Sequence, residues 1–146
     1  MEQLPKYASL KFRPYKGSIN DGITMAQAAY PLMRVEEMYL IQAEAIAHSS
    51  AANGLKMLNT FMQKYRTANY DYPTQGVQKE VAINEIVKQK RIELWGEGQS
   101  FFDYKRLNRS VDRTQGEDAQ YIPARQQLSN AGNGRPAWMN LVFPPT

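Results

Sequence analysis

Two glutamates near the middle of the chain have the spacing of a carboxylate pair. Glu93 and Glu97 are four residues apart, so in one helix they would lie on one face. Glycoside hydrolases use two carboxylates, one as general acid and the other as base or nucleophile. Basic residues flank this pair on both sides: Lys90, Arg91, Lys105 and Arg106. A structural ion network accounts for that pattern better than catalysis does, and we predict that the chain is not an enzyme.

Other catalytic and metal-binding chemistries lack the residues that they require. The chain has no cysteine, and His48 is its only histidine, with no acidic or cysteine partner at the spacing of a metal site. His48 falls near the end of an expected helix, where a cation is favourable, so we predict a capping or surface role. The sequence contains no phosphate-binding glycine loop and no serine elbow. We therefore expect neither a metal nor a cofactor.

Aromatic residues in loop-like sequence are the candidates for ligand binding. Tyr70 and Tyr72 belong to a stretch, 67–76, that is rich in Asn, Asp, Pro and Gly, and Trp138 follows a similar stretch. Aromatic rings offer flat apolar area that can stack on a sugar ring. Tyr70, Tyr72 and Trp138 are therefore our predicted ligand-binding residues. The alternative for the two tyrosines is that they fold back onto their own domain.

Composition and charge limit the class of protein. With 146 residues, 42% of them hydrophobic, the chain is long enough for one compact domain, which we expect over 1–146. The net charge is +4, with acids and bases interleaved, which indicates a solvated surface and no nucleic-acid partner. No run of about 18 apolar residues occurs, so we predict no transmembrane segment. The first residues also lack the apolar core of an export signal.

Helical patterns occupy the middle of the chain. We expect the first helix over 31–48, beginning at Pro31. Its apolar face recurs at intervals of three and four residues: Leu32, Val35, Tyr39, Ala43 and Ile46. After turn residues at 49–54, a second helical pattern runs to Tyr65, and a third covers 83–94. Helices joined by short turns pack as antiparallel hairpins, so the predicted fold is mainly α, with tetratricopeptide-like packing.

The third helix is expected to run into Gly98, turn there and restart. Glycine tolerates the left-handed conformation of a helix end with little strain. Four charged residues should fix the two helices across this turn: Glu93, Glu97, Asp103 and Arg106. Three apolar residues should insert into the hairpin core: Leu94, Phe101 and Phe102.

The two ends of the chain lack helical periodicity. We expect an extended N-terminal arm over 1–29, with a strand-like alternation at 7–16, and a helical core over about 30–108. Residues 109–146 are rich in Gly, Asn and Pro, and we expect them to form an irregular tail. Short strands could form in it near 121–122 and 141–143.

Three motifs between residues 30 and 107 follow the order and spacing of a known family. The first contains Arg34, Glu37, the pair Tyr39 and Leu40, and Ala43, Glu44 and Ala45. The second is Leu58 and Asn59, followed by Arg66. The third is Arg91 to Leu94, then Glu97 and Gly98, then Phe102 and Asp103, with Arg106. Together they resemble the pattern of the SusD/RagB family of glycan-binding proteins of Bacteroidetes.

The resemblance implies a function and a location. Family members are lipid-anchored proteins of the outer membrane, largely helical, which capture oligosaccharides and pass them to a SusC-like TonB-dependent porin without catalysis. The chain would then be the C-terminal portion of such a protein, and the signal peptide and lipidated cysteine would lie in the part that precedes it. A helical-repeat adaptor for a protein partner is the alternative, and a glycoside hydrolase that uses Glu93 and Glu97 ranks third.

Overall fold

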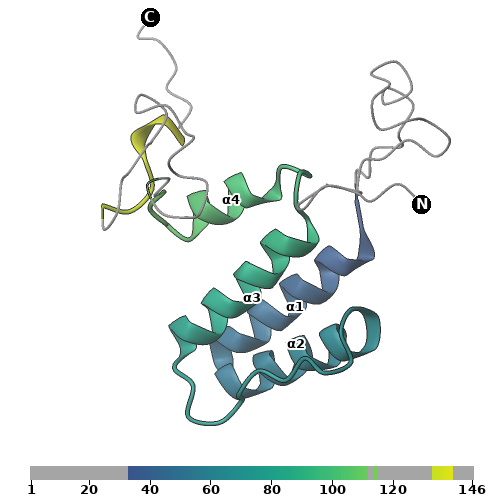
Figure 1. Cartoon of the computed structure of the whole chain (residues 1–146). Coiled ribbons are helices and arrows are strands. Elements are labelled where there is room, and N and C mark those ends of the chain that lie inside the picture. Colours follow the sequence, from purple (N-terminus) through teal and green to yellow (C-terminus); the bar gives the residue numbers. More distant parts are fainter. Residues whose placement is uncertain (1–32, 112–113, 115–132, 140–146) are drawn as a thin grey trace, which may run out of the picture. The chain divides into compact units, whose positions relative to one another are not determined.

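The computed structural model describes residues 33–111, 114 and 133–139, and these are mainly helical (Figure 1). The elements are α1 (Val35–Ser49), α2 (Ala51–Tyr65), α3 (Lys79–Glu93), α4 (Gln99–Arg106) and the 3-10 helix η4 (Ala137–Met139). No strand occurs in this described part, and the predicted mainly α fold is confirmed. The strands suggested at 7–16, 121–122 and 141–143 lie outside it.

All of these elements belong to one compact unit, Val35–Thr146. The N-terminal arm over 1–29 and most of the tail over 109–146 lie outside the described residues. The single domain over 1–146 therefore stays a prediction. Within the described residues, none of the helices has both the length and the apolar character needed to cross a membrane.

The first two helices form a hairpin with a one-residue connection. Ser50 alone separates α1 from α2, and its Oγ accepts a hydrogen bond from the backbone N–H of Asn53 at 3.4 Å. This contact satisfies one of the amide groups that every helix N-terminus leaves unpaired. Asn53 and Gly54, which we expected in a turn, therefore belong to the first turns of α2.

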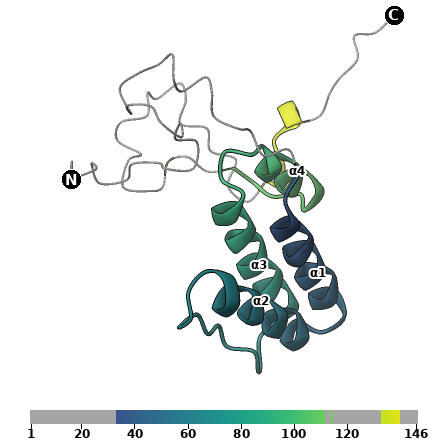
Figure 2. The ribbon, with the colours of Figure 1, turned by 90° about the vertical axis from the view of Figure 1, so that its right-hand side faces the viewer.

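Three helices build the core. α1 and α3 run side by side in opposite directions, and α2 folds back against both (Figures 1 and 2). Their buried side chains form one apolar cluster: Leu40, Ala43, Ala47, Leu55, Leu58, Phe61, Ala82, Ile83, Ile86 and Val87. Burial of this surface, at roughly 25 cal/mol per Å² of apolar area, is the main source of stability for such a unit.

The predicted start and face of the first helix were partly wrong. α1 begins at Val35, four residues after Pro31, and Val35 is 64% exposed. The buried face instead follows Leu40, Ala43 and Ala47, which recur at three and four residues. Val35 lies in the first turn of α1 and projects from the helix outside this stripe. Leu32 lies outside the described residues.

The turn after the third helix also differs from the prediction. α3 ends at Glu93, and the next five residues form a turn in which Gly96 (φ 79°) and Gly98 (φ 82°) are left-handed. Leu94 is buried, as expected, but Phe101 and Phe102 are 40% and 62% exposed. The prediction that these two rings enter the core was wrong, because the buried side chain of α4 is Asp103.

Candidate functional site

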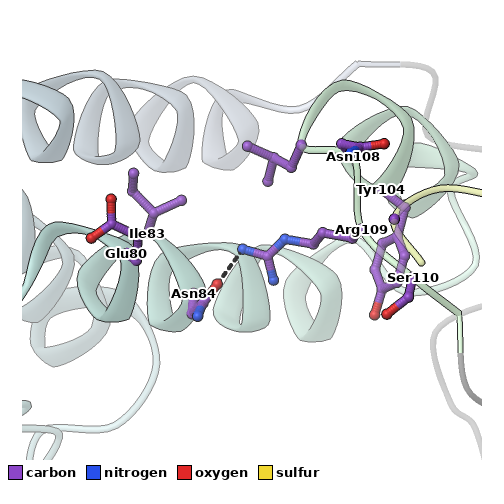
Figure 3. Close-up of a pocket in the computed structure, with 9 residues that line it drawn as sticks. Glu80, Ile83, Asn84, Tyr104, Asn108, Arg109 and Ser110 are labelled. Carbon is purple, nitrogen blue, oxygen red and sulfur yellow. Dashed lines mark hydrogen bonds between the residues drawn. The ribbon is translucent and has the colours of Figure 1, made fainter. Parts of the chain in front are cut away.

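A pocket of about 610 Å³ lies between α3 and the end of α4 (Figure 3). Its walls combine acidic, basic, amide and aromatic side chains, chiefly Glu80, Asn84, Tyr104, Asn108, Arg109 and Ser110. Arg109 crosses the pocket and donates a hydrogen bond from Nη2 to Oδ1 of Asn84, which joins the segment after α4 to α3.

Further contacts hold the walls of the pocket. Asn108 is left-handed (φ 50°), a conformation that asparagine tolerates better than most residues, and its Oδ1 accepts from the backbone N of Arg135 at 3.2 Å. The Nη1 of Arg135 donates to the carbonyl oxygen of Lys105 at 3.2 Å. Arg91 lies over the ring of Tyr104 and donates to its hydroxyl at 2.7 Å. Tyr104, Asn108 and Arg109 are therefore held in place around the pocket.

Tyr70, the first predicted ligand residue, lies in the loop between α2 and α3 and packs partly against the core. Its hydroxyl donates to Oε1 of Glu85 on α3 at 2.8 Å, and its carbonyl oxygen accepts from Nε2 of Gln63 at 2.8 Å. Burial raises the pKa of Tyr70, and the neighbouring Glu85 raises it further. Tyr70 thus holds its loop onto the helices.

Tyr72 is held through its backbone. Asn59 on α2 donates from Nδ2 to the carbonyl oxygen of Tyr72 at 2.9 Å and accepts from its N–H at 3.0 Å. A third contact, at 3.3 Å, joins the same amide to Oδ1 of Asp71. Asn59 is buried, so these bonds satisfy a polar group that would otherwise be costly in the core. Both tyrosines contact their own domain, and their role in ligand binding stays a prediction.

Trp138, the third predicted ligand residue, lies in η4. The same segment contains Gly134, which lines the pocket beside Asn108. Trp138 therefore comes from a different part of the fold than the tyrosine loop, and from the segment that approaches the pocket.

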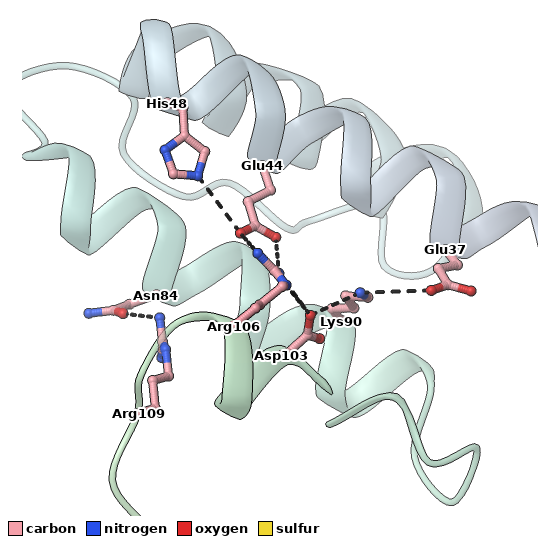
Figure 4. A network of polar contacts seen from close by, with 8 residues as sticks. All are labelled: Glu37, Glu44, His48, Asn84, Lys90, Asp103, Arg106 and Arg109. Atoms are coloured by element: carbon pink, nitrogen blue, oxygen red, sulfur yellow. Dashed lines mark hydrogen bonds and ion pairs between the residues drawn. The ribbon is translucent and has the colours of Figure 1, made fainter. Parts of the chain in front are cut away.

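A network of ion pairs joins α1, α3 and α4 (Figure 4). Arg106 on α4 makes two hydrogen bonds with Glu44 on α1, at 2.7 and 2.6 Å, and two with Oδ1 of Asp103, at 3.0 and 2.7 Å. Lys90 on α3 lies 3.1 Å from the same Asp103 oxygen and 3.8 Å from Oε1 of Glu37. Three helices therefore meet through charged groups at this point.

Most of this network is withdrawn from water. Glu44, Lys90 and Asp103 are 4%, 5% and 2% exposed. The hydrogen bonds that Arg106 donates to Glu44 and Asp103 raise the pKa of Arg106, although burial acts in the opposite direction. His48, near the end of α1, is half-exposed and lies 4.0 Å from Glu44. Within the described residues, no group of three or more acidic, histidine or cysteine side chains could hold a metal.

Glu93 forms a second set of ion pairs. Arg66, just after α2, donates to Oε1 of Glu93 at 2.7 Å and to Oε1 of Glu36 at 3.3 Å, which joins the ends of three helices. Because α3 ends at Glu93, Glu97 is not on the same helix, so the premise of a shared helical face was wrong. Glu97 and Arg34 are both half-buried.

Lys90 was expected in an ion network, as one of the bases that flank Glu93 and Glu97, whereas Glu44 was not. The spacing gave a signal for the burial of Lys90, because it lies four residues from both Ile86 and Leu94, on the apolar stripe of α3. A lysine on such a stripe needs a buried partner. Glu44 offered a similar signal, since it adjoins the buried Ala43 and Ala47 positions of α1.

The α1–α2 hairpin, and the ion pairs that join α1, α3 and α4, define a protein built from antiparallel helices. The family model described as the SusD family matches residues 4–138, and the chain belongs to that family. None of the curated proteins and none of the solved structures matches the chain.

Proposed function

We propose that the chain is part of a non-catalytic outer-membrane protein that captures oligosaccharides for uptake. The observation that carries this proposal is the SusD family match, which extends over residues 4–138. The captured ligand would pass to a SusC-like TonB-dependent porin, and a lipid anchor would hold the intact protein at the cell surface.

The surroundings of Glu93 support a binding role over a hydrolytic one. Its carboxylate is engaged by Arg66 at 2.7 Å, and Glu97 lies beyond the end of α3. A retaining glycosidase places its two carboxyl groups about 5 Å apart on either side of the scissile bond, free to react. A carboxylate that is fixed in an ion pair between helices is suited to a structural role and not to catalysis.

The test begins with the intact protein and a panel of neutral hexasaccharides in isothermal titration calorimetry. We expect binding of at least one, no release of reducing sugar, and co-purification of a TonB-dependent porin from solubilised outer membranes. A gene for such a porin immediately beside the gene of this protein would support the pairing. Capture of a protein partner with no carbohydrate affinity would favour the adaptor alternative and contradict the proposal.

Tyr70, Tyr72 and Trp138 remain our proposed aromatic contacts to the ligand. The Tyr70→Ala, Tyr72→Ala and Trp138→Ala triple variant should lose affinity for the bound hexasaccharide. Because Tyr70 also holds its loop through Glu85, the variant needs a melting curve beside the calorimetry. Unchanged affinity in a folded triple variant would remove these residues from the site.

A further inference from the structure

Two polar side chains that line the pocket of about 610 Å³ have no side-chain partner among the described residues. Glu80 on α3 and Ser110 after α4 make no side-chain hydrogen bond or ion pair with any residue in the part of the chain that the structure describes. The neighbouring Arg109 differs, because its guanidinium already bonds to Asn84 (Figure 3). Glu80 and Ser110 are therefore available to a ligand without breaking a contact of the fold.

The charges of the pocket exclude some ligand classes. Its lining carries one acidic and one basic side chain, Glu80 and Arg109, so the formal charges cancel. A phosphate or sulfate would meet the carboxylate of Glu80, and Arg109, the one cation of the lining, already bonds to Asn84. A purely apolar ligand would bury the carboxylate and the amides without partners, which is costly. A neutral ligand with many hydroxyl groups avoids both penalties.

The pocket also has an apolar wall. Ile83, buried in the core, and Leu107, half-buried against it, lie among the polar side chains. Tyr104 adds an aromatic ring whose orientation is fixed by Arg91 at 5.1 Å. A pyranose ring has the matching character, since its hydroxyl groups lie around its edge and its C–H groups form an apolar face. The volume also falls within the roughly 300–1,000 Å³ typical of ligand sites.

Two other pockets fit such a ligand less well. The pocket of about 320 Å³ beside His48 and Lys90 is lined by charged groups that already pair with one another, among them Arg106 and Glu44. The pocket of about 210 Å³ over Phe61 and Tyr65 is smaller than a typical ligand site, and two of its polar side chains are already engaged: the hydroxyl of Thr60 donates to the carbonyl oxygen of Lys56, and the Lys64 ammonium lies over the ring of Tyr65. Of these three pockets in the described part of the chain, the one between α3 and the end of α4 combines unengaged polar groups with an apolar wall.

We propose that this pocket binds one pyranose unit of a neutral oligosaccharide, with the carboxylate of Glu80 accepting hydrogen bonds from its hydroxyl groups and the hydroxyl of Ser110 donating or accepting them. Asn84 would contribute its Nδ2, since its Oδ1 is held by Arg109. The inference rests on the proposed function and adds a binding site to it, on residues separate from Tyr70, Tyr72 and Trp138.

The test compares two variants of the intact protein. Glu80→Ala combined with Ser110→Ala removes both unengaged groups, and Lys56→Ala changes an exposed residue of α2 that lines none of the three pockets described above. Calorimetry uses neutral gluco-, manno-, xylo- and galacto-hexasaccharides, with triglycine as a zwitterionic control. Hydrogen exchange with and without the best-bound sugar locates the site. Melting curves establish that both variants are folded.

We expect the double variant to lose about tenfold or more in affinity, as for a bound ligand that loses a hydrogen bond to a charged group. Lys56→Ala should bind like the unaltered protein, and the sugar should slow exchange in peptides covering 80–84 and 104–110. If the double variant still binds the sugar, and the sugar does not slow hydrogen exchange in these peptides, the inference is overturned and the proposed function stands. Binding of triglycine but no sugar, or of no probe at all, counts against both.

Discussion

Arg106 on α4 and Glu44 on α1 form a two-pronged ion pair across 62 positions of sequence, with N–O distances of 2.7 and 2.6 Å. Parallel bonds of this kind fix orientation as well as distance, because the guanidinium and the carboxylate are both planar. The same guanidinium holds Asp103, which in turn holds Lys90 on α3. The short helix α4, with only one buried residue, is therefore positioned on the hairpin mainly by charge.

Arg106→Ala should destabilise the chain by about 2 kcal/mol. The change leaves Glu44 buried without its cation and leaves Asp103 with Lys90 alone. Breaking a fully buried pair costs roughly 3–5 kcal/mol, and we expect less here because the Arg106 side chain is 43% exposed. Urea unfolding of the 146-residue chain measures the loss.

Lys88→Ala is the matched control for Arg106→Ala. Lys88 also pairs with an acid, Glu85 at 3.4 Å, but its side chain is 64% exposed. Exposed pairs contribute roughly 0–1 kcal/mol, so this variant should unfold at nearly the same urea concentration as the unaltered chain. Equal losses from the two variants would contradict the assignment of α4's position to the buried network.

Gly98→Val should destabilise the chain by about 1–2 kcal/mol through backbone strain alone. Gly98 has φ 82°, and a Cβ built there would meet no atom within 4 Å, so steric crowding by neighbours plays no part. A β-branched residue resists this left-handed conformation, whereas asparagine tolerates it. Gly98→Asn should therefore melt closer to the unaltered chain than Gly98→Val does. An unchanged melting temperature for Gly98→Val would show that the turn does not require the left-handed residue.

Gly54→Ala should destabilise the hairpin by about 2 kcal/mol for a different reason. A Cβ at Gly54 would lie 2.5 Å from Cβ of Ala47 and 2.7 Å from the carbonyl oxygen of Ala43. Overpacking of this kind costs roughly 1–3 kcal/mol, and the crowded atoms belong to backbone or to a short side chain that cannot move aside. Urea unfolding measures the loss.

Asn53→Ala provides the comparison for Gly54→Ala. It adds helix propensity one residue away, at an exposed side chain, and should leave stability unchanged or slightly higher. A gain from both substitutions would mean that α1 and α2 are farther apart at this point than the structure has them.

The helices could be predicted from the sequence because their apolar residues recur at three and four positions. That pattern specifies a face but not a boundary, so the start of α1 and the end of α3 were displaced by several residues. Phe101 and Phe102 were misplaced for a related reason. Large apolar side chains usually enter a core, but α4 has only eight residues and directs Asp103 inward.

The candidate site was less accessible to sequence reasoning than the fold. The pocket joins Glu80 and Asn84 to Arg109 and Ser110, and none of these residue types is unusual in an exposed segment. Their grouping depends on how α4 turns back along α3, which local spacing does not determine. The ion network depends on the same long-range geometry, since its partners are up to 62 positions apart.

Glu85 should make stability depend on pH in the acid range. Burial by itself would raise the pKa of this carboxyl group, but hydrogen bonds from Gln89 and Tyr70 and the charge of Lys88 outweigh it and lower the pKa. A carboxyl group whose pKa is lowered by folding stabilises the fold at pH values above its pKa in the unfolded chain, near 4.3. This stability is lost as the pH falls through the pKa in the folded chain.

The Glu85→Gln variant tests that pH dependence. It should reduce stability at pH 7, where the carboxylate is charged in both states, and change it little at pH 3. Urea midpoints at the two values give the comparison, and Lys56→Ala serves as the surface control. A loss that is the same at both pH values would assign the effect of Glu85 to packing and not to its charge.

Tyr70 should lose its proton at a higher pH than an ordinary tyrosine does. Burial and the neighbouring Glu85 raise its pKa above the ordinary value near 10, so the stability that it provides is complete below pH 10 and is lost as pH rises through the folded pKa. Absorbance at 295 nm follows tyrosine ionisation, and the chain has nine tyrosines. Tyr70→Phe should remove the late part of that titration.

Tyr65→Phe is the control, because Lys64 lowers the pKa of Tyr65, and this variant should remove an early part instead. A late phase that survives in Tyr70→Phe would place the shifted group elsewhere.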